Sequence, residues 1–102
     1  MAKKFRLSGK DISLIHKKGK RFNIEGVSVK YLVNNLGYPR FAVNVPTSVS
    51  KKATERNRLR RLVYRELGRQ KGNIDCLIRI HRPEDEKNLQ SKIRKICVKL
   101  SP

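Results

Sequence analysis

Residues 51–67 of the chain read KKATERNRLRRLVYREL, and this segment combines an amphipathic helical pattern with a dense series of arginines. Because successive residues of a helix are about 100° apart, four apolar side chains fall on one stripe: Leu59, Leu62, Val63 and Leu67. The stripe predicts a helix that packs on the core of its domain. The opposite side then carries Asn57, Arg58, Arg61 and Arg65, and one flank carries Arg56, Arg60 and Tyr64.

The balance of charges separates this helix from an ordinary solvated one. On a surface helix, each i, i+4 pair of opposite charges contributes about 0.2–0.5 kcal/mol, and each like pair costs a similar amount. Arg56 with Arg60 and Arg61 with Arg65 are like pairs, and the segment holds only two acids. Since a guanidinium presents a planar fork of donors that fits phosphate oxygens, the segment predicts contact with a nucleic acid.

The charge of the whole chain supports the same partner. Lys and Arg number 26 against 8 Asp and Glu, which gives a formal charge of +18 over 102 residues. A net charge of this size destabilises the compact monomer and favours acidic partners. A basic helix that binds an anionic membrane usually carries Trp, Phe and Leu on its other face, but this chain has no Trp and its three Phe are dispersed. We therefore expect no membrane partner.

Length and cysteine content limit the architecture. A chain of 102 residues suits one domain, residues 1–102, with one core. The sequence has no apolar run of 18 residues, and its start lacks the apolar region of a secretory signal, so we expect a cytoplasmic protein. Cys76 and Cys97 lie at apolar periodic positions and form no metal motif, so we interpret both as reduced core residues.

The pattern along the chain predicts six main elements. Ser8 and Asp11 form a capping-box pattern at the start of a helix that ends at Gly19. Period-two alternation predicts strands at 27–33 and 40–45, joined by turn residues as an antiparallel hairpin, with a possible short extra strand near 21–24. A strand at 74–81 follows the arginine helix, with Ile74, Cys76, Ile78 and Ile80 inward. A last helix begins after Pro83 and carries Leu89, Ile93, Ile96, Cys97 and Leu100 inward.

The resulting order is helix-strand-strand-helix-strand-helix. It predicts an α+β fold, a single-domain two-layer sandwich on a mixed β-sheet. The strand before the arginine helix and the strand after it can pair in parallel across that helix.

The pattern AxxRNRLxRLxxRE over residues 53–66 resembles the signature helix of the bacterial ribonuclease P protein component. The surroundings agree with it: Arg6-Leu7 begins the match, the first helix ends at Gly19, and residues 39–43 and 75–78 resemble two strands of the family. The resemblance spans nearly the whole chain in the right order.

The resemblance implies a small α+β domain whose parallel strands are joined by an unusual left-handed βαβ crossover. It implies a protein subunit that binds the catalytic RNA of ribonuclease P and assists removal of the 5′ leader from precursor tRNA. The RNA would supply the active site and hold the Mg²⁺, with no catalytic or metal-binding residue in the protein. The residues expected against the catalytic RNA are Lys51, Lys52, Arg56, Asn57, Arg58, Arg60, Arg61 and Arg65.

The resemblance also implies a separate cleft for the single-stranded leader, with Ile12, His16, Lys30 and Arg40 as the expected contacts. Relatives commonly carry aromatic side chains on the first helix, where leader bases can stack. The matching positions here are Ile12 and His16, so we expect the leader to be held more by charge than by rings. Relatives often carry a basic pair where this chain has Thr47-Ser48, and Lys51 and Lys52 can compensate.

The other titratable residues favour binding over chemistry by the protein. A self-contained nuclease needs a general base, an acid or a metal cluster. His16 and His81 come from different elements, and His81 is interpreted as a strand-end residue without a special role. The acids Glu84, Asp85 and Glu86 are interpreted as first-turn helix acids, which the helix dipole favours.

Two other classes of protein remain open. A structural RNA-binding protein, such as a small ribosomal protein, shares the charge and the size but needs only one RNA surface. A helix that reads a DNA major groove is less favoured, because the arginine row is too continuous for selective base contacts and no dimer element is present.

Overall fold

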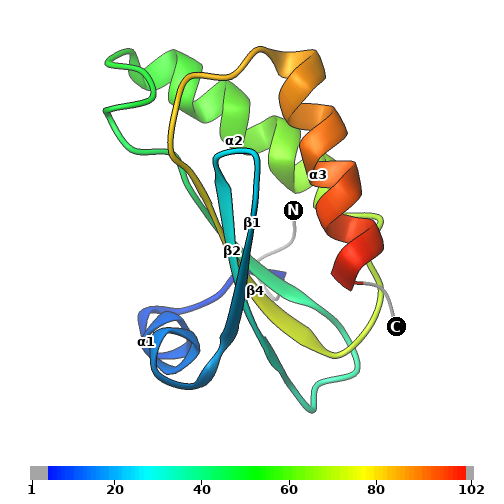
Figure 1. The fold of residues 1–102 in the computed structure, drawn as a ribbon. Helices are drawn as coiled ribbons and strands as arrows, with labels where there is room; N and C mark the ends of the chain where they lie inside the picture. Colours follow the sequence, from blue (N-terminus) through cyan, green and yellow to red (C-terminus); the bar gives the residue numbers. More distant parts are fainter. Residues whose placement is uncertain (1–4, 101–102) are drawn as a thin grey trace.

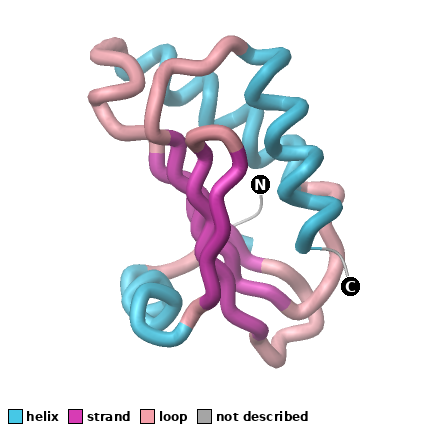
Figure 2. The backbone as a smooth tube through the Cα atoms, in the orientation of Figure 1, coloured by secondary structure: helices cyan, strands magenta, loops and turns pink. Residues whose placement is uncertain are grey.

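The computed structural model describes residues 5–100, which form three helices and a four-stranded sheet. The elements in chain order are α1 (Gly9–Lys18), β1 (Lys20–Ile24), β2 (Val27–Val33), β3 (Arg40–Asn44), α2 (Ala53–Leu67), β4 (Ile74–Ile80) and α3 (Glu86–Leu100). Helices α2 and α3 cover one face of the sheet, and α1 lies against the other face (Figures 1 and 2). The predicted α+β fold is confirmed, with α1 as an addition outside the main two layers.

The strand order is β1-β2-β4-β3, so the predicted hairpin between strands 27–33 and 40–45 is wrong. Strand β4 lies between them and pairs antiparallel with β2 and parallel with β3. Strand β4 has residues of low exposure on both faces, since Ile78 on one face is buried and Leu77 on the other is half-buried. Cover on both faces is typical of a strand in the middle of a sheet. The parallel pairing of β3 and β4 across α2 is confirmed.

The short strand near residues 21–24 is confirmed as β1, which forms a hairpin with β2. Glu25 and Gly26 make the turn with φ values of 48° and 88°. Positive φ at both central residues is the geometry of a tight type I′ turn, whose twist matches that of paired strands. The hairpin in this sheet therefore involves β1 and β2, not β2 and β3.

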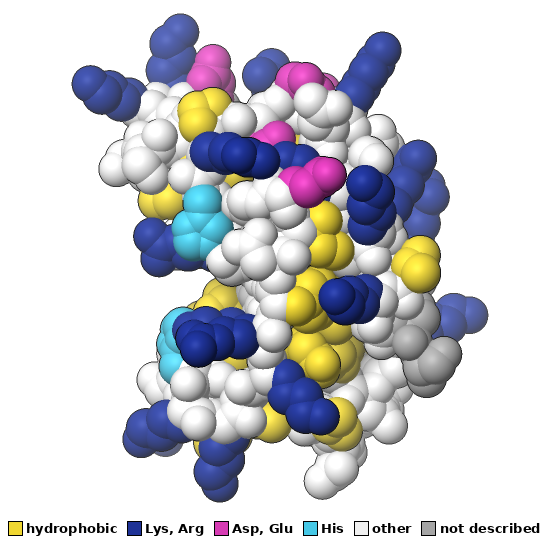
Figure 3. All heavy atoms as spheres, viewed as in Figure 1, with side chains coloured by type: hydrophobic (Ala, Val, Ile, Leu, Met, Phe, Trp, Pro, Cys, Tyr) yellow, Lys and Arg dark blue, Asp and Glu magenta, His cyan; other side chains and the backbone are white. Residues whose placement is uncertain are grey.

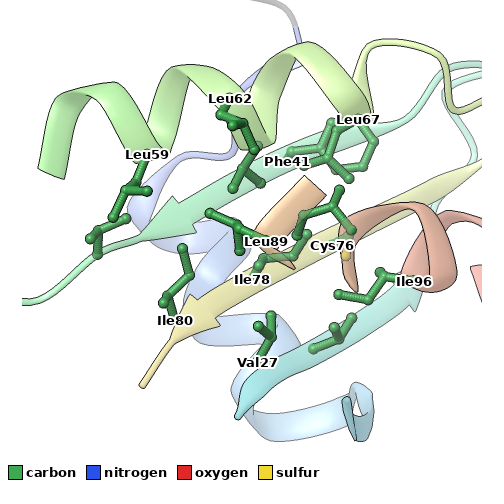
Figure 4. Close-up of a cluster of buried hydrophobic side chains, with 14 of the residues drawn as sticks. Val27, Phe41, Leu59, Leu62, Leu67, Cys76, Ile78, Ile80, Leu89 and Ile96 are labelled. Carbon is green, nitrogen blue, oxygen red and sulfur yellow. The ribbon is translucent and has the colours of Figure 1, made fainter. Parts of the chain in front are cut away.

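The core lies between the sheet and the pair α2 and α3 (Figure 4). The predicted stripe of α2 is confirmed, because Leu59, Leu62, Val63 and Leu67 are each at most 6% exposed. Complete burial of such a side chain contributes about 1.5–3 kcal/mol. The other predicted inward residues that are buried are Ile74, Cys76, Ile78, Ile80, Leu89, Ile93 and Ile96.

The cysteines and the ends of α1 also agree with the predictions. Cys76 is buried and Cys97 is half-buried, both are reduced, and burial raises the pKa of each thiol. Ser8 and Asp11 make the capping box, and α1 ends at Gly19. Helix α3 begins at Glu86, so of the three acids expected in its first turn only Glu86 lies there. Asp85 caps the helix by accepting the Asn88 N–H at 2.8 Å, and Glu84 pairs with Lys92 instead. Among residues 5–100, no helix is both long and apolar enough to cross a membrane.

Candidate nucleic-acid interface

The arginines that the sequence predicts on the exposed face of α2 lie on that face. Asn57, Arg58, Arg61 and Arg65 are all exposed. Within residues 5–100, Arg61 and Arg65 form no ion pair. Arg58 Nε lies 3.1 Å from Glu86 Oε1, but both side chains are more than half exposed, and such a pair contributes little. This face of α2 therefore presents guanidinium groups that are available to an anion.

On the flank and at the start of α2, the arginines bond to other parts of the protein and the lysines are exposed. Arg56 Nη1 donates to the carbonyl oxygens of Ser50 at 2.9 Å and Lys51 at 3.1 Å, which fixes the loop before the helix. Arg60 Nη1 donates to Asn57 Oδ1. Lys51 and Lys52 are exposed at the positive end of the helix dipole, where cations are unfavourable unless an anion is bound.

Most of the carboxylates that the structure describes bond to residues outside the exposed face of α2. Glu66 is 4% exposed and accepts from Gln90 Nε2 at 2.7 Å and Arg94 Nε at 3.4 Å, and these contacts lower its pKa. Buried Lys92 pairs with Glu84. Glu55 accepts from Ser50 Oγ at 2.5 Å, and this bond lowers the Glu55 pKa. Among residues 5–100, the exposed Arg58–Glu86 pair is therefore the one ion pair on the exposed face of α2, and Arg61 and Arg65 have no acidic partner.

A cleft lies between α1 and the sheet face that it covers. Two adjoining concavities, of about 320 Å³ and about 260 Å³, share three lining residues, which are His16, Leu77 and Arg79. We call their union the α1 cleft; its other lining residues are Ile12, Ser28, Lys30, Ala42, Val43, Asn44, Arg60 and His81. Figure 3 shows a hollow on this side of the molecule, with a histidine at each of its edges and Lys or Arg side chains nearby.

Strand register explains why these side chains share one face. Lys30 of β2 lies opposite Leu77 of β4, and Leu77 lies opposite Ala42 of β3. Lys30 Nζ is 2.8 Å from His16 Nδ1, a contact that joins β2 to α1 across the cleft. Because an ammonium can only donate, Nδ1 is the acceptor here. The structure thus brings together three of the four predicted leader contacts, Ile12, His16 and Lys30.

The fourth predicted contact, Arg40, has a structural role instead. Its Nε and Nη2 donate to Asp75 at 2.9 and 2.7 Å, and its Nη1 and Nη2 donate to Asp11 at 3.1 Å. These bonds raise the pKa of Arg40 and hold its guanidinium between β4 and α1. Arg40 therefore has few donors left for a leader phosphate and does not line the α1 cleft, and its contact with the leader stays a prediction.

Arg79 and His81 are among the cleft residues that reasoning from the sequence missed. Arg79 lines both parts of the cleft, and the alternation of Ile78 and Ile80 could have placed it on the outer face of β4. His81, interpreted as a strand-end residue, lines the cleft as well, and its Nε2 is hydrogen-bonded to Ser28 Oγ. Nothing in the pattern indicated that the two histidines, 65 residues apart, would border one cleft.

In the part of the chain from Phe5 to Leu100, no three His, Cys, Asp or Glu side chains lie together as a possible metal site.

Comparison with known proteins identifies the family. The Ribonuclease P family model matches residues 1–101. Several solved structures share the fold. The RNase P protein of Staphylococcus aureus has a TM-score of 0.79 and 18% identity, covering 90% of this chain and 91% of that chain. The RNase P protein of Thermotoga maritima has a TM-score of 0.74 and 24% identity, covering 95% and 98%.

The third structure is the Thermotoga maritima RNase P protein in complex with 1-(4-fluorophenyl)-2-thiourea. It has a TM-score of 0.72 and 25% identity, covering 90% of this chain and 95% of that chain. No curated protein sequence gives a match. The match over nearly the whole chain does not favour a ribosomal protein. The chain therefore belongs to the ribonuclease P protein family, as a protein subunit of the tRNA-processing enzyme ribonuclease P.

Proposed function

We propose that this subunit binds the catalytic RNA of ribonuclease P through α2 and holds the 5′ leader of precursor tRNA in the α1 cleft. The observation that carries the proposal is the exposed face of α2, where Arg61 and Arg65 have no acidic partner among residues 5–100. A row of unpaired guanidiniums on a packed helix repels itself until phosphates cover it.

The α1 cleft has the properties that a single-stranded leader requires. Lys30, Arg60 and Arg79 supply positive charge along its length, and Leu77 and Ala42 supply an apolar floor. The cleft carries no ring of Phe, Tyr or Trp among its lining residues, so charge is proposed to hold the leader. This second RNA surface is what a purely structural RNA-binding protein would not need.

In this proposal the RNA carries out the cleavage and holds the Mg²⁺. The enzyme is proposed to act in the cytoplasm. The protein then contributes by reducing repulsion between phosphates. If about eight phosphates are covered, counterion release predicts a loss of affinity of roughly 10³-fold or more between 50 and 200 mM salt. The engagement of the carboxylates in caps and ion pairs supports this role, because few of them are left to bind cations.

Reconstitution tests the proposal. The purified chain is added to a candidate ribonuclease P RNA and labelled precursor tRNA at a Mg²⁺ concentration at which the RNA alone is slow. Leader removal that needs both components is the expected result. Cleavage by the protein alone would contradict the division of labour, and no stimulation of several candidate RNAs would contradict the assigned function.

A further inference from the structure

A concavity of about 500 Å³ lies where the second half of α2 meets the start of β3 and the segment before α1. We call it the Tyr64 pocket. Its floor is apolar: Phe41 and Leu67 are 1% and 0% exposed, and Pro39 is buried. Figure 4 shows Phe41 close to Leu67 at the end of α2. Pockets for small ligands span about 300–1,000 Å³, so this one is large enough for a planar heterocycle.

One wall of the Tyr64 pocket combines a ring with a guanidinium. Tyr64 is half-buried, and the Cζ of Arg6 lies 5.6 Å from the centre of its ring. This separation is typical of a cation–π contact. Aromatic rings and guanidinium planes are the surfaces on which unstacked RNA bases settle. The wall therefore offers a tyrosine ring for stacking, and the lining of the α1 cleft has no Phe, Tyr or Trp.

The rim of the Tyr64 pocket is cationic. Arg61 and Arg65 line it from successive turns of α2, and within residues 5–100 neither has an acidic partner. An apolar protein segment would fit the floor but leave both guanidiniums unpaired. A free phosphate would satisfy the rim but leave the floor empty. A nucleotide matches both parts, because it joins an apolar-faced base to an anionic phosphate.

A polar group inside the pocket can contact the edge of a base. Gln70 is 8% exposed, and its Nε2 donates to the Lys71 carbonyl oxygen at 3.3 Å. This bond points the amide nitrogen at the backbone and leaves Oε1 as an acceptor for an exocyclic amine. Adenine, guanine and cytosine carry such an amine, and uracil does not.

We infer that the Tyr64 pocket takes one unpaired nucleotide of the RNA partner, with its base against Tyr64 and its phosphates on Arg61 and Arg65. The inference rests on the proposed function and adds to it a position at which a base leaves its helix and enters the protein. It gives α2 a contact that depends on the base as well as on charge.

The first test uses the whole chain and free nucleotides. Amide NMR spectra are recorded during titration with AMP, GMP, CMP and UMP, and with ribose 5-phosphate as the probe without a base. The nucleotides should shift the amide signals of Leu67, Gly68 and Gln70, with UMP the weakest of the four. Equal shifts from ribose 5-phosphate, or no shift at these three residues at millimolar concentration, would overturn the inference.

The second test uses the RNA partner and the variant Tyr64→Ala, with Tyr64→Phe to restore the ring. Loss of one stacked base lowers affinity by roughly 5- to 150-fold. Because the base contact is uncharged, the dependence of affinity on salt should keep the wild-type slope, and Tyr64→Phe should recover most of the affinity. Tyr31→Ala, a change of another half-buried tyrosine outside the pocket, controls for lost stability.

The two tests separate this inference from the proposed function. If Tyr64→Ala binds RNA like the wild type while removal of Arg61 and Arg65 weakens binding, the pocket is empty in the complex and only the inference fails. If removal of the arginines has no effect either, the assignment of α2 as the RNA surface fails as well. The nucleotide titration reports on the pocket in either case, since it needs no RNA partner and no variant.

Discussion

Arg40 Nη2 lies 2.7 Å from Asp75 Oδ2, and this ion pair is the centre of a network that positions α1 over the sheet. The same guanidinium reaches Asp11 of α1 at 3.1 Å. Asn34 Nδ2 donates to Asp75 Oδ1 at 2.8 Å, which ties the β2–β3 connection to the same carboxylate. One side of the α1 cleft therefore depends on a residue that does not line the cleft itself.

Replacement of Arg40 by Ala should destabilise the fold. Asp75 is 6% exposed, so the variant would leave a buried carboxylate without its cation. Removal of one partner of a buried pair costs about 3–5 kcal/mol, and because the Arg40 side chain is 21% exposed we expect about 3 kcal/mol. Urea denaturation measures this loss as a lower free energy of unfolding. Arg40→Lys keeps the charge without the fork and should lose less; a change below about 1 kcal/mol for Arg40→Ala would contradict the role of the network.

Asp11 should make stability depend on acidity. A hydrogen bond from Ser8, followed by the charge of Arg40, lowers the pKa of Asp11 below its ordinary value of 3.8. Since the folded state binds this proton less readily than the unfolded state, the contribution is complete above about pH 4 and is lost as the pH falls through the folded pKa. Asp11→Asn should therefore cost about 2 kcal/mol at pH 7, and the difference from the wild type should shrink at pH 3.

Denaturation curves of both proteins between pH 7 and pH 2.5 measure this difference. A gap between wild type and Asp11→Asn that stays the same at every pH would show that the charge of Asp11 contributes nothing to stability.

Lys30 should distinguish precursor from mature tRNA. It lies in the α1 cleft, 2.8 Å from His16, where the leader of the precursor is proposed to pass. Lys30→Glu places an anion beside the leader phosphates, so affinity of the assembled enzyme for precursor tRNA should fall roughly tenfold while affinity for mature tRNA is retained. The charge-matched control is Lys95→Glu on α3, an exposed residue outside the cleft. Equal losses for both tRNAs with Lys30→Glu would remove this residue from the leader path.

Local features of the fold could be predicted from the sequence because neighbouring residues determine them. The spacing of Leu59, Leu62, Val63 and Leu67 indicated which side of α2 is buried, and therefore which arginines are exposed. The capping box at the start of α1 is equally local, since it joins residues three apart.

Pairing between distant segments could not be predicted in the same way. The alternation in β2 and β3 shows that both are strands but does not show that β4 separates them, because hydrogen-bond partners are chosen by packing of the whole sheet. The ion pair of Arg40 could not be predicted for the same reason, since its partner Asp75 is 35 residues away along the chain. A pattern of polar and apolar residues predicts charged side chains at the surface, but Glu66 and Lys92 are buried. Their burial is explained by their hydrogen-bond partners, which are distant in the sequence or in another element.

The measurement that tests the α2 surface most directly is the salt dependence of binding to the catalytic RNA. Replacement of Arg61 and Arg65 by Ala removes two proposed phosphate contacts without touching the core. Affinity in a filter-binding titration should fall, and the slope of log affinity against log salt should flatten by about 2.

The double variant Lys87→Ala and Lys95→Ala on α3 removes the same charge elsewhere and should keep nearly the wild-type slope. Unchanged affinity and an unchanged slope after loss of Arg61 and Arg65 would contradict the account, because these guanidiniums would then not contact the RNA.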